Sequence, residues 1–162
     1  MNAPNELFVK MVIDAWNREL DATDKLLAKL TDEQLMQEVS PSRNRGIYLL
    51  GHLTAEHDQM MPLLRFQEAT RPELKPIFLD APDKVVATLP SLQQLRADWK
   101  TVNDTLMAHI ARVPADEWFT RHANIAEADF TNEPHRNRLN VVLSRTTHLS
   151  NHRGQLTLLT NK

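Results

Sequence analysis

Apolar residues recur at spacings of three and four along four stretches of the chain, with polar residues between them. The stretches cover about residues 5–30, 45–66, 91–113 and 136–161. This period is typical of amphipathic helices, and no segment has the strict alternation of a half-buried strand. The sequence therefore predicts an all-α fold. The clearest apolar stripe is made of Leu92, Leu95, Trp99, Val102, Leu106, Ile110 and Val113.

The four predicted helices are separated by two long irregular connections, at about residues 67–90 and 114–136. Thr31 and Ser91 each begin a Ser/Thr-x-x-Gln capping box, which is a typical helix start. In the last helix, Val142, Leu149 and Leu156 repeat every seven residues, as in the seam of a helix bundle. These features predict one domain, residues 1–162, folded as a four-helix bundle with two long connections.

Composition narrows the possible partners. The 162 residues carry 19 Lys plus Arg against 21 Asp plus Glu, a net charge of −2, so nucleic acid and an anionic membrane are not expected partners. No apolar run is long enough to cross a bilayer, and the first ten residues lack the apolar core of a signal peptide. These observations predict a cytoplasmic protein. The chain has no Cys, so any metal ion must be bound by nitrogen and oxygen.

The sequence also excludes several classes of site. Three glycines are too few for a dinucleotide-binding fingerprint, and Gly46 and Gly51 have Walker A spacing without the Lys and Ser/Thr that bind phosphate. No Glu-x-x-His or His-Glu-x-x-His occurs, which argues against di-iron bundles and zincins. No nucleophile elbow supports a Ser-His-Asp hydrolase.

Histidines carry the remaining candidate chemistry. His148 and His152 are four residues apart, so their rings project from one face of the last helix and can converge on a metal ion. His52, in the middle of the second helix, can supply a third imidazole and complete a tri-His site with open coordination positions. The alternative for His52 alone is a core histidine bonded to a backbone carbonyl.

Four residues near these histidines each have a candidate role or an expected position. Glu56 can be a fourth ligand, an acceptor for a ring N–H, a general base or a solvated carboxylate. His57 lies about 140° around the helix from His52 and is expected to be exposed. Arg153 is either a surface cation or a contact for a substrate carboxylate. Gly154 is expected where a neighbouring helix approaches closely.

His52 together with the segment His148-Leu-Ser-Asn-His-Arg-Gly-Gln155 resembles the DinB family of metal-binding four-helix proteins. The resemblance covers the whole chain in helix order and length, and the His-Arg-Gly-Gln ending is its most specific part. It implies an up-down-down-up bundle, a divalent ion held by three histidines, and frequent homodimers. Related proteins include transferases and isomerases that use low-molecular-weight thiols.

We therefore expect a metal-dependent enzyme with His52, His148 and His152 as ligands, acting as a small-thiol-dependent transferase or as a hydrolase. Zinc, nickel, iron and manganese all accept such a ligand set. The alternative is a non-catalytic dimeric bundle with a structural ion, and an open coordination position that faces a solvent-connected pocket lined by the 67–90 connection would argue against it. Met11 and Trp16, which look exposed, add to the expectation of a homodimer, unless Trp16 only widens the core-facing stripe.

Overall fold

The computed structural model describes residues 3–162, and this part of the chain is all-helical, as predicted. Two isolated β-bridges are the only β pairing in that range. No helix in it is long and apolar enough to cross a bilayer. The long helices are α1 (Ala3–Lys29), α3 (Gly46–Leu63), α5 (Leu92–Ile110) and α7 (Arg138–Thr157). The short ones are α2 (Asp32–Leu35), α4 (Leu74–Phe78), α6 (Glu127–Phe130) and the 3₁₀ turns η1 (Glu117–Phe119) and η2 (Leu158–Asn161).

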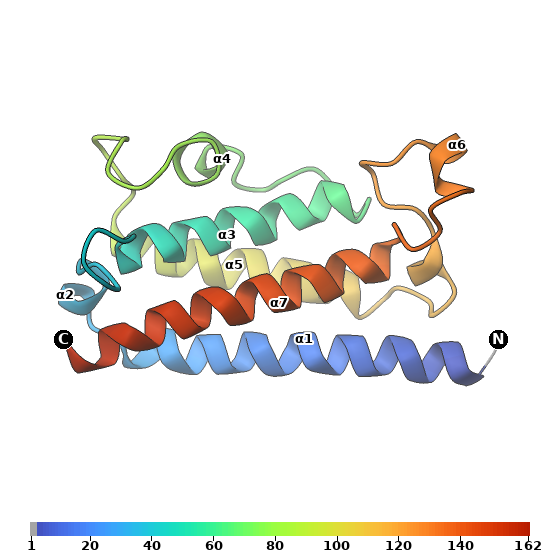
Figure 1. Cartoon of the computed structure of the whole chain (residues 1–162), viewed down its shortest axis with the longest axis horizontal. Helices are drawn as coiled ribbons and strands as arrows, with labels where there is room; N and C mark the ends of the chain where they lie inside the picture. The colour runs from blue at the N-terminus through green and yellow to red at the C-terminus, as the bar shows by residue number, and fades with distance from the viewer. Residues whose placement is uncertain (1–2) are drawn as a thin grey trace.

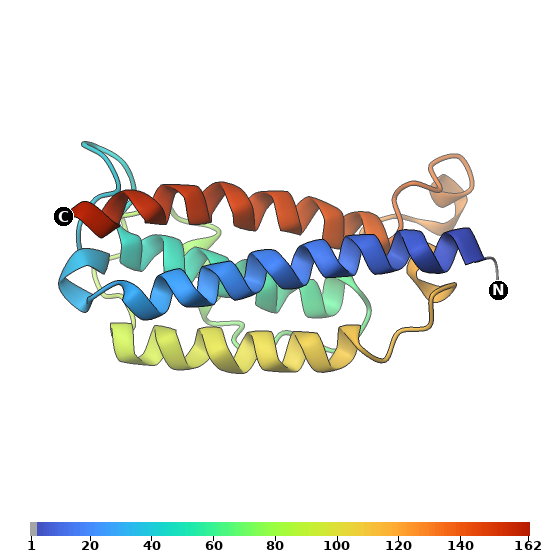
Figure 2. The same cartoon turned by 90° about the horizontal axis from the view of Figure 1, so that it is seen from below.

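The four long helices lie side by side along the long axis of the molecule (Figure 1). Helices α1 and α7 run in one direction, and α3 and α5 run in the opposite direction (Figures 1 and 2). Helix α1 packs along α7, and α3 packs along α5. Helix α3 also contacts α4 and α7, so it is covered from several sides.

The helix starts follow the capping residues. The Thr31 side chain accepts a hydrogen bond from the Gln34 amide N–H, and the Gln34 side chain accepts one from the Thr31 N–H, which confirms the first capping box. At α5 the Ser91 hydroxyl accepts from the Gln94 N–H. The Gln94 side chain instead donates to Asp98, so the second box is only half formed.

The core lies between the long helices and includes the predicted seam of α7. Val142, Leu149 and Leu156 are all completely buried. Trp16 is completely buried as well, so the expectation that it is exposed was wrong and it does widen the core-facing stripe. Met11 is 59% exposed, as expected.

The connection over residues 67–90 is fastened to α3 by polar contacts. The Asp58 carboxylate is completely buried and accepts hydrogen bonds from the backbone N–H groups of Thr70 and Arg71, at 2.8 Å each. Farther along, the Tyr48 hydroxyl donates to the carbonyl oxygens of Phe78 (3.2 Å) and Ala81 (2.8 Å). These bonds hold α4 against α3 and fix the position of the Phe78 backbone.

Candidate metal centre

Three histidines meet in the contact between α3 and α7. His52 comes from the middle of α3, and His148 and His152 come from adjacent turns of α7. The Nε2 atom of His148 lies 3.2 Å from Nε2 of His52 and 3.1 Å from Nε2 of His152. One ligand atom from each ring lies within 4.8 Å of the other two, and all three rings are half-buried. The structure thus brings together the histidines that the sequence singles out.

Hydrogen bonds fix how two of the rings face the centre. His52 Nδ1 donates to the carbonyl oxygen of Phe78 at 2.9 Å, and His152 Nδ1 lies 3.0 Å from Oε1 of Gln155. A carbonyl oxygen only accepts, so these Nδ1 atoms carry the proton in the neutral rings and Nε2 keeps its lone pair. Such partners are the usual outer contacts of metal-binding histidines. His148 Nδ1 is buried without a hydrogen-bond partner.

The residues fit a nitrogen-bound divalent ion. Nitrogen atoms about 2.0–2.1 Å from a tetrahedral ion stand about 3.3 Å apart, close to the separations in this cluster. Burial, reinforced by the neighbouring rings and Arg145, lowers the pKa of His148 to about 3. Burial also lowers the pKa of His152. These two rings are therefore neutral at pH 7, and lone pairs that face one another at this distance repel unless a proton or a cation lies between them.

Gly51 explains why His52 can reach the Phe78 carbonyl. A Cβ atom at Gly51 would lie 2.3 Å from the Phe78 ring, so only glycine lets α4 pack this closely on α3. The close approach that the sequence analysis assigned to Gly154 was wrong. A Cβ atom at Gly154 would meet nothing within 4 Å, because that residue lies on the exposed side of α7.

Glu56 and Arg145 form an ion pair next to the three histidines, with Arg145 Nη2 2.8 Å from Glu56 Oε2. Glu56 follows His52 by one turn of α3, and Arg145 precedes His148 by one turn of α7. The field of Glu56 acts on His152 and that of Arg145 on His148, where they shift the two pKa values in opposite directions. Glu56 is not in the group of atoms that could share one ion.

Arg153 points to α1. Its Nε lies 2.9 Å from Oε2 of Glu19, and its Nη2 lies 3.2 Å from Oε1 of the same carboxylate. The guanidinium therefore makes a two-pronged ion pair with a residue of the protein. A role of Arg153 in binding a substrate carboxylate stays a prediction.

His57 is completely buried, so the expectation that it is exposed was wrong. Its ring lies between Trp16 and Trp99, at centroid distances of 4.9 and 5.0 Å, and Nδ1 is 2.7 Å from Oδ1 of Asn103. Nε2 has no hydrogen-bond partner. Burial lowers the pKa of His57 to about 4, so the ring is neutral at pH 7.

Two cavities are lined by sequence neighbours of the clustered histidines, and none of the three histidines is among their lining residues. One, of about 370 Å³, is lined by the Glu56–Arg145 pair and by residues of the 67–90 connection, including Lys75 and Leu79. We call it the α3–α7 cavity. Its remaining lining residues are Gln59, Pro62, Leu63, Ala123 and Asn124. The other, of about 540 Å³, is lined by Gln155 and by the loop before α3.

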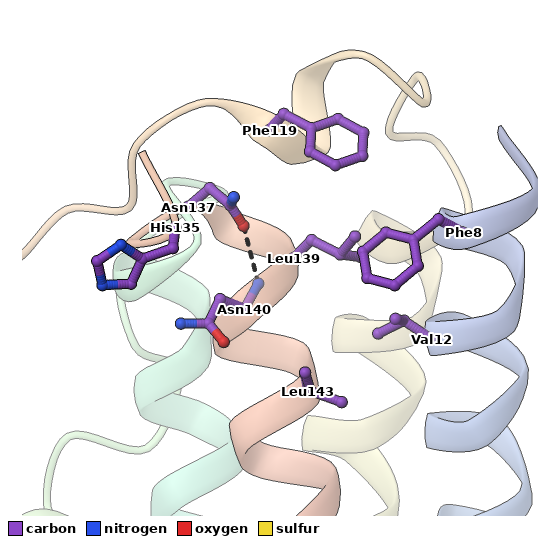
Figure 3. A pocket seen from close by; sticks show the side chains of 8 residues that line it. All are labelled: Phe8, Val12, Phe119, His135, Asn137, Leu139, Asn140 and Leu143. Carbon is purple, nitrogen blue, oxygen red and sulfur yellow. Dashed lines mark hydrogen bonds between the residues drawn. The ribbon is translucent and has the colours of Figure 1, made fainter. Parts of the chain in front are cut away.

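A third cavity, of about 230 Å³, lies between the first turns of α1 and α7 (Figure 3). Phe8 and Val12 of α1 face Leu139 and Leu143 of α7 across it, and Phe119 covers one side (Figure 3). Its lining is largely apolar and contains none of the three clustered histidines. This cavity has the character of an apolar contact surface more than that of a catalytic site.

The sequence matches no family model and no curated protein. Among solved structures, it is similar to a conserved protein from Enterococcus faecalis, with a TM-score of 0.65 and 14% sequence identity. The match covers 99% of this chain and 96% of that chain. At this identity the likeness concerns the fold alone.

Proposed function

We propose that the protein is a metal-dependent enzyme of the DinB type, built as an up-down-down-up four-helix bundle, and that it acts as a small-thiol-dependent transferase or as a hydrolase. The observation that carries the proposal is the convergence of the three histidine Nε2 atoms, with separations of 3.1 and 3.2 Å. The His148-to-Gln155 segment supports the same assignment, because Gln155 is the residue that orients His152.

His52, His148 and His152 would hold the ion, with zinc, nickel, iron or manganese as candidates. A dipositive ion held by three neutral ligands would acidify a water molecule or thiol at an open position, which supplies a nucleophile near neutral pH. Phe78 and Gln155 fix two of the rings through their hydrogen bonds. Glu56, one turn from His52, is placed to accept a proton once it leaves Arg145.

The alternative is a structural ion in a non-catalytic dimeric bundle. A structural zinc site usually has four protein ligands, whereas three histidines leave a position open. The α3–α7 cavity, with walls from the 67–90 connection, has room for a small molecule and is lined by Glu56 and Arg145, each one helical turn from a histidine of the cluster. These two observations favour the enzyme over the structural ion.

We also propose a cytoplasmic homodimer that uses neither nucleic acid nor a membrane. Helix α1 exposes three large apolar side chains near its start: Leu7 is 61%, Phe8 50% and Met11 59% exposed. Leu143 of α7, 44% exposed, faces the Phe8 side of the same cavity (Figure 3). A monomeric mass by light scattering at high micromolar protein concentration would contradict the dimer.

The test of function begins with elemental analysis of the purified protein and a zinc titration of the metal-free protein. We expect one divalent ion per chain. Assays of thiol transfer and ester or amide hydrolysis, with and without chelator, then search for the reaction. A His109→Ala variant is a matched control, because His109 contacts Gln67 and lies outside the cluster.

The same samples decide between a catalytic and a structural ion. The core of a 162-residue chain is large enough to fold without a metal ion, so circular dichroism after exhaustive chelation should retain most of the helical signal. Loss of most of that signal at room temperature would favour the structural ion.

A further inference from the structure

The Arg145 guanidinium has unused binding capacity. A guanidinium carries five N–H donors, and within residues 3–162 Arg145 has one ion-pair partner, Glu56, whose Oε2 lies 2.8 Å from Nη2. Its side chain is only 26% exposed, so little of it is solvated. Arg153 uses two of its donors on Glu19. Helix α7 thus makes one Arg–Glu pair on either side of His148 and His152.

The surroundings of Arg145 suit a small anion. Arg145 and Glu56 line the α3–α7 cavity, whose volume of about 370 Å³ is in the range of small-molecule sites. Lys75 adds a second cation to the lining, and Gln59 and Asn124 add amide groups. Glu56 is the only acidic residue among the lining side chains. Lys75 already pairs with Asp80 at 2.8 Å, so once Glu56 moves aside Arg145 is the lining cation that no carboxylate of the described residues occupies.

We propose that Arg145 binds a carboxylate of the substrate, and that this carboxylate displaces Glu56 from the guanidinium. A carboxylate already occupies the position, since Glu56 bonds there at 2.8 Å. The planar fork of a guanidinium matches a carboxylate better than it matches a point anion, and a free ligand can align both of its oxygens with the fork. The substrate class is then a small molecule with at least one carboxylate.

This inference rests on the proposed function in one respect: the other end of the bound molecule would reach the three histidines. Arg145 precedes His148 by three residues, about 4.5 Å along the helix axis, which is within the length of a four- to six-carbon chain. Displacement would also free the Glu56 carboxylate next to His52. Binding of the substrate would thereby release the proton acceptor that its reaction needs.

The test is calorimetric titration of succinate into the metal-free protein at pH 8 and constant ionic strength, so that binding does not depend on a metal ion. Succinamide serves as the uncharged control ligand. We expect succinate to bind the wild type and succinamide not to bind. Glu56→Gln should tighten succinate binding about tenfold, because the competing carboxylate is removed, and Arg145→Gln should weaken it at least about tenfold.

Glu19→Gln is the matched control, since it breaks the other Arg–Glu pair of α7 and should leave succinate affinity unchanged. Equal binding to wild type, Glu56→Gln and Arg145→Gln would overturn the proposal. So would a loss of binding in Arg153→Gln that Arg145→Gln does not show, since it would place the site at Arg153. If Arg145→Gln does not fold by circular dichroism, Arg145→Lys replaces it: it keeps the charge, loses the fork, and should still weaken binding.

The zinc titration separates this inference from the proposed function. Zinc binding at the histidines without succinate binding would refute the carboxylate site alone. Succinate binding through Arg145 without zinc binding would refute the metal-dependent enzyme and leave the carboxylate site standing.

Discussion

Two histidines of α3, His52 and His57, are five residues apart and have opposite environments. His52 is half-buried beside α7, and both of its ring nitrogens face a partner: Phe78 on one side and His148 on the other. His57 is completely buried against α5, with Asn103 at one nitrogen and none at the other. The ring of His52 therefore lies beside two other imidazoles, whereas the ring of His57 packs between two tryptophans.

The comparison of His52 with His57 shows that a metal site requires more than a buried histidine. Burial is the main cause that lowers the pKa of both His57 and His148, to about 4 and about 3. Only the triad adds two further imidazoles with their Nε2 atoms directed inward. A neutral buried histidine is therefore weak evidence of function, and convergence of ring nitrogens is stronger evidence.

The largest expected effect is on metal affinity. Loss of an outer hydrogen-bond partner usually costs a metal site ten- to hundredfold in affinity, so loss of a ligand in His148→Ala should cost more than about a hundredfold. His57→Gln should bind zinc like the wild type. Competition with a chromophoric chelator measures both variants. Full occupancy in a His148→Ala, His152→Ala double variant would disprove the ligand assignment.

The second effect concerns the contribution of His57 to acid stability. Its pKa is about 4 in the folded chain and about 6.5 when unfolded, so the unfolded chain binds more protons between these values. This contribution is complete above about pH 6.5 and is lost as the pH falls toward 4, by up to about 3 kcal/mol.

Urea unfolding of the metal-free protein across this pH window measures that effect. His57→Gln keeps a polar group for Asn103 and removes the titration, so its free energy of unfolding should fall less steeply than that of the wild type. Identical pH profiles for the two proteins would show that His57 does not resist protonation in the folded chain.

Much of the arrangement could be predicted from the sequence because it depends on local spacing. The seven-residue repeat of Val142, Leu149 and Leu156 places that face of α7 in the core, and all three are buried. The spacing of four between His148 and His152 places both rings on one side of the helix. Helix period alone is enough for these statements.

The environment of His57 could not be predicted in this way. The angle of about 140° from His52 was a sound inference, but the conclusion that His57 is exposed assumed that α3 has one buried face. In the structure α5 covers one side of α3, while α4 and α7 cover others. That covering depends on long-range contacts such as those of Asp58 with Thr70 and Arg71, which no helical period contains.

The Glu56–Arg145 ion pair could be predicted in part from the sequence. Glu56 comes one turn after one ligand, and Arg145 one turn before another, on two helices expected to face each other. Opposite charges at such positions predict an ion pair beside the site. The sequence analysis assigned the candidate anion contact to Arg153, the neighbour of His152 in sequence. Adjacent helical residues point about 100° apart, so Arg153 lies away from the cluster and pairs with Glu19.

The third effect concerns Gly51, which lets Phe78 pack closely enough to bind the ring of His52. A methyl group at Gly51 would overlap the Phe78 ring, so Gly51→Ala should destabilise the protein by about 1–3 kcal/mol and disturb the bond between His52 and the Phe78 carbonyl. Zinc affinity should fall with stability, while the ring of His57 keeps its environment. Urea unfolding and zinc competition measure the two quantities, and unchanged values for both would contradict the role of Gly51.

The smallest effect is expected at Gly154, the glycine of α7 that lies in open space. Glycine within a helix costs up to about 1 kcal/mol relative to alanine, so Gly154→Ala should raise the free energy of unfolding by that amount. In a protein of this size the melting temperature should rise by about 2–4 °C, without a change in zinc affinity. Thermal melts at low and high protein concentration check this. A variant that is destabilised only at high concentration would mean that a second copy packs on this side of α7, and would move the proposed dimer contact from the start of α1 to the exposed face beside the histidines.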